Sequence, residues 1–114
     1  MKLPVKMSRT NTSLLLKLEK LLYENIADPN FGISDFCEQL AISRTQLHRI
    51  ISQEKDMSTS HYVRQLRLIR AKELLATTNL LVYEVADRVG FKNVAYFSTS
   101  FLAAFGYSPK DTKN

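Results

Sequence analysis

One short stretch, SRTQLHR at residues 43–49, concentrates side chains that carry directional hydrogen-bond donors. At helical spacing, one face of this stretch presents Arg44, Thr45, His48 and Arg49. An arginine can pair bidentately with guanine O6 and N7, and a threonine or histidine can hydrogen-bond to a base edge. The alternative interpretation is a solvated basic face on a surface helix. The stretch taken by itself leaves both interpretations open.

Helices are predicted to position these side chains, because apolar residues recur along the chain at intervals of three and four. In the first segment they are Leu15, Leu18, Leu22 and Ile26. This pattern predicts a helix that begins near Asn11 to Ser13. It should stop before Asp28-Pro29, since proline disfavours helix in the residue that precedes it. No alternation with period two is sustained, and the fold class predicted is all-α.

A repeat at an offset of 49 residues relates two parts of the chain, ISDFCEQLAIS (33–43) and VYEVADRVGFK (82–92). The aligned pairs include Cys37 with Ala86, Leu40 with Val89, and Ala41 with Gly90. Each copy predicts a short helix, a tight turn and a second helix, which is the helix-turn-helix pattern. One extra residue in the second turn moves the offset to 50, so that Leu47 matches Phe97. Gly90 is expected to take a positive φ.

Capping residues mark where the helices of the repeat begin. Ser43 and Gln46 form an S-x-x-Q capping box at the start of one second helix, and Asn93 is a favourable N-cap for the other. Between the two units, residues 58–78 contain no helix breaker and predict one long helix with Ser58 as its N-cap. This helix would join the units rigidly.

These segments resemble the DNA-binding domain of AraC/XylS-type transcriptional regulators. The resemblance rests on YVxxLRLxxAxxLL, EVAxxVGF, VGFxNxxYF and FGYSP, and it covers nearly everything from Leu14 to Asp111. It implies about seven helices, arranged as two helix-turn-helix lobes on a long connecting helix. In a helix-turn-helix, the second helix enters the major groove with its N-terminal side chains at the base edges.

The resemblance places the base-contacting positions of the first lobe on Thr45, His48 and Arg49. The candidate DNA-contacting residues are Ser43, Arg44, Thr45, His48 and Arg49 in the first lobe and Asn93, Ala95, Tyr96, Ser98 and Thr99 in the second. The aromatic residues Phe91, Phe97, Phe101 and Phe105 are predicted to be core. Tyr96 is the exception, because its hydroxyl lies near enough to the helix start to reach a phosphate.

The second lobe departs from the family's pattern. The family usually has a basic residue where Thr99 stands, and often lysines where Leu102 and Ala103 stand. Bidentate reading of guanine is lost there, whereas methyl contact with thymine and hydroxyl bonds to phosphate remain available. Two further departures affect helix ends, since Asp56 replaces a usual glycine and Leu81 stands at an N-cap.

Arg64, Arg67 and Arg70 recur at three-residue intervals on the connecting helix. They could contact phosphates or tie the lobes together through acids such as Glu73. Arg67 stands where the family has its characteristic arginine, and we interpret it as structural.

The composition agrees with a small globular domain that has a polyanionic partner. Sixteen Lys and Arg against eleven Asp and Glu give a net charge of +5, with an isoelectric point near 9.5. Such a balance favours phosphate partners, although a lysine-rich soluble domain would show it too. The single cysteine, Cys37, is predicted to be core and excludes an internal disulfide. The sequence shows no signal peptide or membrane-spanning run.

The expected organisation is a linker (residues 1–11), a first lobe (12–57), a connecting helix (58–78), a second lobe (79–111) and a tail (112–114). The predicted activity is sequence-specific binding of double-stranded DNA by a cytoplasmic transcription regulator that is not an enzyme. RNA polymerase is an expected partner, and no cofactor, metal, membrane or small-molecule ligand is expected. The alternative is a protein-interaction module that keeps the frame without reading DNA. A fragment of a longer chain is slightly favoured over a stand-alone regulator.

Overall fold

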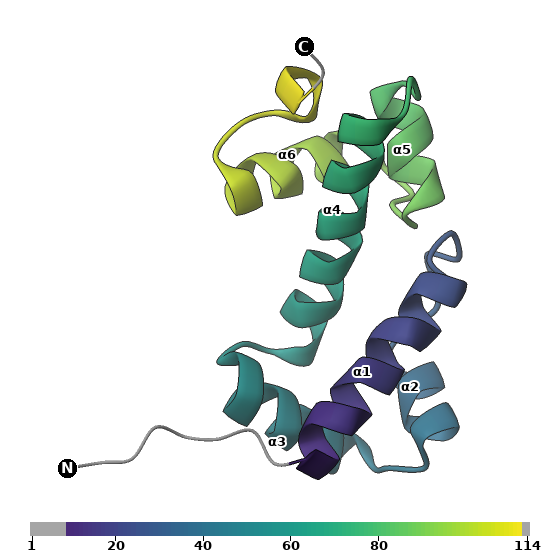
Figure 1. Ribbon diagram of the computed structural model, residues 1–114, viewed down its shortest axis with the longest axis vertical. Coiled ribbons are helices and arrows are strands. Elements are labelled where there is room, and N and C mark those ends of the chain that lie inside the picture. Colours follow the sequence, from purple (N-terminus) through teal and green to yellow (C-terminus); the bar gives the residue numbers. More distant parts are fainter. Residues whose placement is uncertain (1–8, 113–114) are drawn as a thin grey trace, which may run out of the picture.

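The computed structural model describes residues 9–112, and within this range every regular element is a helix. The order is α1 (Arg9–Glu24), α2 (Ile33–Leu40), α3 (Arg44–Lys55), α4 (Thr59–Thr77), α5 (Val82–Arg88), α6 (Val94–Phe105) and the short 3-10 helix η1 (Pro109–Thr112). The predicted all-α class with about seven helices is confirmed. In Figure 1 the two groups of short helices sit at opposite ends of α4, which runs between them.

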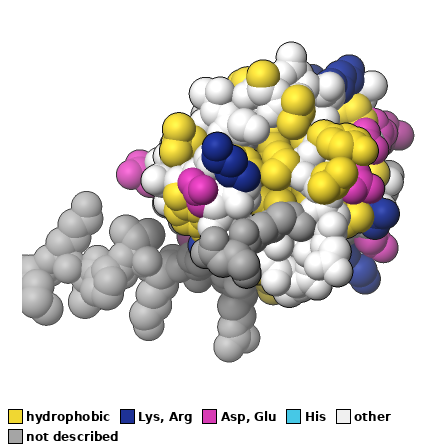
Figure 2. Space-filling model, turned by 90° about the horizontal axis from the view of Figure 1, so that it is seen from above, with side chains coloured by type: hydrophobic (Ala, Val, Ile, Leu, Met, Phe, Trp, Pro, Cys, Tyr) yellow, Lys and Arg dark blue, Asp and Glu magenta, His cyan; other side chains and the backbone are white. Residues whose placement is uncertain are grey.

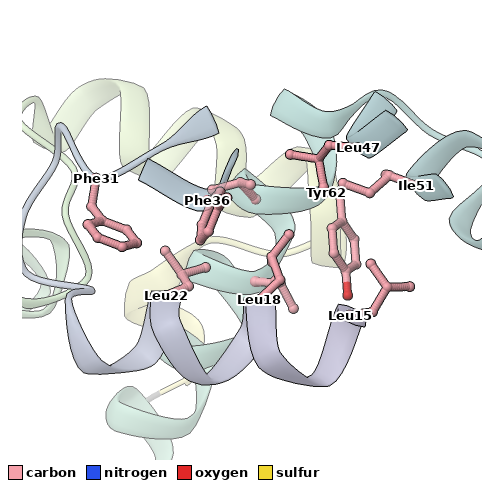
Figure 3. Close-up of a cluster of buried hydrophobic side chains, with 10 residues drawn as sticks. Leu15, Leu18, Leu22, Phe31, Phe36, Leu47, Ile51 and Tyr62 are labelled. Carbon is pink, nitrogen blue, oxygen red and sulfur yellow. The ribbon is translucent and has the colours of Figure 1, made fainter. Parts of the chain in front are cut away.

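Helix α1 begins at Arg9, slightly earlier than expected, and ends well before Pro29. The side chain of Asn11 donates to Glu54 Oε1 of α3 at 3.0 Å, which ties this first turn to the rest of the lobe. The buried stripe of α1 contains Leu15, Leu18 and Leu22, as its periodicity predicts. They pack with residues of α2, α3 and α4 in the core of the first lobe (Figure 3).

The two helix-turn-helix units turn in the same way. Ala41 (φ 55°) and Gly90 (φ 86°), which the repeat aligns, both adopt the left-handed conformation. Ser43 Oγ accepts from the Gln46 amide at 3.1 Å, and Gln46 Oε1 accepts from the Ser43 amide at 3.0 Å. Asn93 Oδ1 accepts from the Tyr96 amide at 2.9 Å. The predicted turns and N-caps are therefore confirmed.

The two departures at helix ends are accommodated locally. Asp56 takes the left-handed conformation (φ 54°) that a glycine would adopt more easily. Leu81 offers no side-chain cap to α5, but the Glu84 carboxylate accepts from the Leu81 amide at 2.9 Å. Half of a capping box thus remains at this helix start.

Helix α4 links two separate hydrophobic cores. Its first half contributes Tyr62, Val63 and Leu66 to the first core, and its second half contributes Leu68, Ala71 and Leu75 to the second. The second core is otherwise largely aromatic, with Phe91, Phe97 and Phe101 buried and Phe105 half-buried. The prediction that these rings are core is confirmed.

Arg67 joins the lobes at the middle of α4. Its guanidinium is buried and donates to four main-chain carbonyls: those of Ile26, Asp28 and Phe31 from the first lobe and that of Val89 from the second, at 2.6–3.1 Å. Burial lowers the pKa of Arg67 and Asp28 acts in the opposite direction, but a guanidinium remains charged in proteins. The structural interpretation of Arg67 is confirmed. Glu73 instead pairs with Arg70 within α4, and no ion pair joins it to either lobe among residues 9–112.

Candidate nucleic-acid interface

Helix α3 presents its predicted contact residues to solvent. On the inward face of α3, Leu47 and Ile51 are fully buried. The five candidates are all exposed: Ser43, Arg44, Thr45, His48 and Arg49. Among the described residues, no hydrogen bond or ion pair engages the Arg49 guanidinium. Its fork of donors is therefore available for a bidentate acceptor such as a guanine edge or a phosphate.

Two other polar side chains on this face, Arg44 and His48, already form hydrogen bonds within the protein. Arg44 Nη2 donates to Ser34 Oγ at 2.8 Å, which braces α3 against α2. His48 Nδ1 lies 2.6 Å from Thr59 Oγ1 in the first turn of α4. His48 consequently has only its Nε2 edge left for an external partner. No sequence pattern indicates either contact.

Helix α6 presents a thinner set of polar groups than α3. Ala95, Tyr96 and Thr99 are exposed and Ser98 is half-buried. The Asn93 side chain is occupied in its cap, and the Thr99 hydroxyl donates to the Ala95 carbonyl at 3.0 Å. Thr99 can therefore still accept a hydrogen bond, but its proton is engaged in the helix itself. Two large apolar residues of the same helix, Val94 and Leu102, are also exposed, at 45% and 50%.

The two candidate helices lie on the same side of α4 (Figure 1). Between α4 and α6 runs a groove of about 400 Å³, whose polar lining includes His61, Arg64, Gln65 and Thr99. Arg64 Nη1 donates to the Tyr96 hydroxyl at 3.4 Å. His61 and Gln65 were missed at the sequence level, although their i, i+4 spacing beside Arg64 indicates a polar stripe on the connecting helix.

A second cavity, of about 550 Å³, lies between the lobes. Its walls are mostly apolar, and its charged residues are Arg64, Arg67 and Lys92, with no carboxylate among the lining residues. Lys92 and Asn93 bring the start of α6 to this cavity. Arg64 and Tyr96 line both this cavity and the groove between α4 and α6.

The net charge is unevenly distributed along the chain. The first lobe (12–57) holds five Lys and Arg against seven Asp and Glu, and the second lobe (79–111) holds three of each kind. The connecting stretch (58–78) holds four basic residues and one acid. Seen from above, onto the second lobe, hydrophobic side chains gather in the middle of the face and to the right of it (Figure 2). Charged groups lie mainly along the right-hand edge, with basic and acidic side chains also left of the middle.

Neither a metal centre nor a membrane span is found within residues 9–112. No group of three or more His, Cys, Asp or Glu side chains could hold a metal ion in this range. None of its helices is long and apolar enough to cross a membrane. Cys37 is half-buried and packs against the first core.

Comparison with known proteins places this arrangement in a family. A family model described as a helix-turn-helix domain matches residues 36–114. The C-terminal domain of AraT, a response regulator from Geobacillus stearothermophilus, superposes with a TM-score of 0.77 at 29% identity, over 96% of this chain and 87% of that one. The chain belongs to the AraC-type helix-turn-helix domain family.

Two curated relatives are much longer than this chain. Histidine kinase P4 of Formosa agariphila is 30% identical over 96% of this chain and 8% of its own length. The transcriptional activator RhaR of Cronobacter sakazakii is 36% identical over 75% of this chain and 30% of its own length. The chain therefore spans less than a third of each of these relatives.

Proposed function

We propose that this domain binds double-stranded DNA sequence-specifically, with α3 and α6 in successive major-groove segments on one face of the duplex. The observation that carries the proposal is the placement of α3 and α6, the second helices of the two helix-turn-helix units, on the same side of α4. Each unit has a capped second helix, and Arg67 fixes the lobes against each other. Successive major-groove segments are about 34 Å apart, which the 44 Å long axis of the protein can span.

The exposed groups divide into base-reading and phosphate-holding sets. Arg49, His48 and Thr45 carry directional donors and acceptors suited to base edges. A second set suits phosphate oxygens, which position a protein on DNA without reading its sequence. It contains Ser43 and Arg44 at the start of α3, and Arg64 and Tyr96 in the groove between α4 and α6. Asn93, Ala95, Ser98 and Thr99 complete the contact surface at the start of α6, where free amides favour an anion.

The biological role proposed is that of the DNA-binding part of a cytoplasmic transcription regulator. The relatives supporting it include a transcriptional activator, a response regulator and a histidine kinase, in which a matching domain accompanies a longer chain. RNA polymerase is the proposed protein partner. No catalytic role, cofactor or small-molecule ligand is proposed for this segment.

A second candidate function is favoured by the α6 face. Val94 and Leu102 are exposed, no Lys or Arg lies on this helix, and the second lobe has no net charge. Such a surface fits protein contact as well as it fits DNA. The second candidate is therefore a module that docks on polymerase or another regulator without reading DNA.

Selection from a random duplex pool, followed by a salt titration on the winning sequence, separates the two functions. DNA reading predicts an enriched motif and an affinity that falls linearly with log[salt], because bound phosphates release counterions. An unenriched pool at low salt, or an affinity that does not change with salt, would reject DNA reading in favour of protein docking.

A further inference from the structure

Thr59 makes an unusual contact for a residue in the first turn of a helix. It is 1% exposed, and its Oγ1 lies 2.6 Å from His48 Nδ1 on the neighbouring helix. Capping of α4 falls to Ser58 instead, whose hydroxyl accepts from the His61 amide at 3.1 Å. The Thr59 hydroxyl is thus left for His48, whose ring is exposed on the α3 face.

The direction of this hydrogen bond follows from the groups available. Within the described part of the chain, Thr59 Oγ1 has no hydrogen-bond partner other than His48. The free backbone groups at a helix start are N–H donors, so they cannot accept the hydroxyl proton. A buried hydroxyl without an acceptor is unfavourable. The Thr59 hydroxyl therefore donates its proton to His48 Nδ1. The proton of the neutral imidazole must then reside on Nε2.

We propose that Thr59 is a positioning residue that holds neutral His48 in its Nε2–H form and presents that donor to the DNA. This inference rests on the function proposed above and adds a base preference to it. An Nε2–H donor selects acceptor groups in the major groove, which are guanine O6 and N7, adenine N7 and thymine O4. It disfavours the amino groups of cytosine and adenine, which are donors themselves.

The tautomer can be measured in the free domain, independently of any DNA. Nitrogen-15 NMR of the imidazoles, recorded near pH 8 where a neutral ring is favoured, distinguishes the protonated from the unprotonated ring nitrogen. We expect His48 to be protonated at Nε2. In Thr59→Val, which removes the hydroxyl but nearly keeps the shape, we expect a mixture of tautomers. Thr59→Ser should restore the wild-type pattern, and His61 serves as an unaffected internal control.

The base preference is read from the motif selected by each variant. Thr59→Val should lose about three- to tenfold in affinity for the wild-type site, the effect of one hydrogen bond, with relaxed preference at one base pair. Thr59→Ser should select the wild-type motif. Matching thermal unfolding of the two variants would show that a difference in motif does not arise from misfolding.

Each outcome decides a separate part of the proposal. A wild-type His48 protonated at Nδ1 would overturn it, as would a Thr59→Val motif identical to the wild-type motif. An Nε2–H tautomer in a domain that selects no DNA would uphold the Thr59 contact and reject the base preference together with the proposed function.

Discussion

Arg49 and Arg67 show how the environment decides what an arginine does. Arg67 is buried and satisfied by four main-chain carbonyls, so its charge serves the fold. Arg49 is exposed on α3 and, among the described residues, no protein group occupies its guanidinium. The fork of an unoccupied arginine on the exposed face of α3 matches the two acceptors of a guanine edge.

Replacing Arg49 with alanine is expected to weaken binding to the selected site by about 1–3 kcal/mol and to relax preference at one base pair. Fluorescence anisotropy on the selected site, its single-base variants and random DNA measures both effects. Arg70→Ala, which removes an exposed arginine paired within α4, is the control and should leave the motif unchanged. An equal loss on selected and random DNA would make Arg49 a phosphate contact.

At the residue scale, the sequence predicts which side chains are exposed, but not which of them form hydrogen bonds within the protein. The exposure of Arg49 and the burial of Leu47 follow from helical periodicity. The contacts of Arg44 with Ser34 and of His48 with Thr59 depend on how separate helices meet. Periodicity carries no information on that geometry. Arg67 was interpreted correctly through the family resemblance, but its carbonyl partners could not be predicted.

The recognition elements of the two lobes share a frame and differ in their exposed chemistry. Helix α3 presents Arg49 and the Nε2 edge of His48, whereas α6 presents Ala95, the Tyr96 hydroxyl and Thr99 with its proton already engaged. Reading of base identity should therefore be concentrated under α3. Affinity should still require α6, because a helix N-terminus and hydroxyl groups can hold phosphates.

Thr99→Arg is expected to tighten binding and to add a guanine preference in the half-site under α6, since it restores a bidentate donor there. Selection with the variant and the wild type measures this gain directly. Thr77→Arg adds the same charge to the last turn of α4, and should increase affinity without adding a base preference. The expectation would be wrong if the wild-type motif already carried equal information in both halves.

The turn at Gly90 allows a comparison with a second glycine of similar conformation. Gly90 and Gly106 have φ values of 86° and 81°. A Cβ at Gly90 would collide with Arg67 Nη1 and lie 2.6 Å from the Ile26 carbonyl, whereas a Cβ at Gly106 would meet nothing within 4 Å. Only the turn at Gly90 therefore combines backbone strain with a steric clash.

Gly90→Ala should lower the free energy of unfolding substantially more than Gly106→Ala, which carries only the left-handed penalty of about 1–2 kcal/mol. Urea unfolding of the two variants, followed by circular dichroism, tests the difference. If both variants lost a similar free energy of unfolding, Arg67 and the Ile26 carbonyl could move aside. The contact between the lobes would then not be rigid.

Helix identities, turns and caps were predictable because they depend on local signals. The boundaries of α4, the capping box at Ser43 and the positive φ of Gly90 all follow from nearby residues. The groove lined by His61 and Gln65 did not follow. It exists only because α6 lies across α4, and the angle between two helices is set by packing in the second core.

For the whole molecule, the relative placement of the lobes is the property on which DNA recognition depends. Arg67 binds carbonyls of both lobes, and Ile26, in the turn that follows α1, packs against the second core. The lobes are thus connected by contacts as well as by α4. A fixed separation would let one chain read two neighbouring groove segments without dimerising.

Arg67→Met should lower the free energy of unfolding by more than about 2 kcal/mol, because it leaves four carbonyls without their charged donor. Arg70→Met, at an exposed ion pair on the same helix, should change it by less than about 1 kcal/mol. Thermal unfolding of the two variants and the wild type measures these changes in the free energy of unfolding. Equal small losses would show that the carbonyls are hydrated readily and that Arg67 does not hold the lobes together.

The central claim is that α3 and α6 occupy successive major-groove segments on one face of a duplex. A hydroxyl-radical footprint of the wild-type domain on its selected site tests this most directly. The account predicts two protected patches on one face, with centres about 10–10.5 base pairs apart. A single patch, or two patches on opposite faces of the duplex, would contradict it.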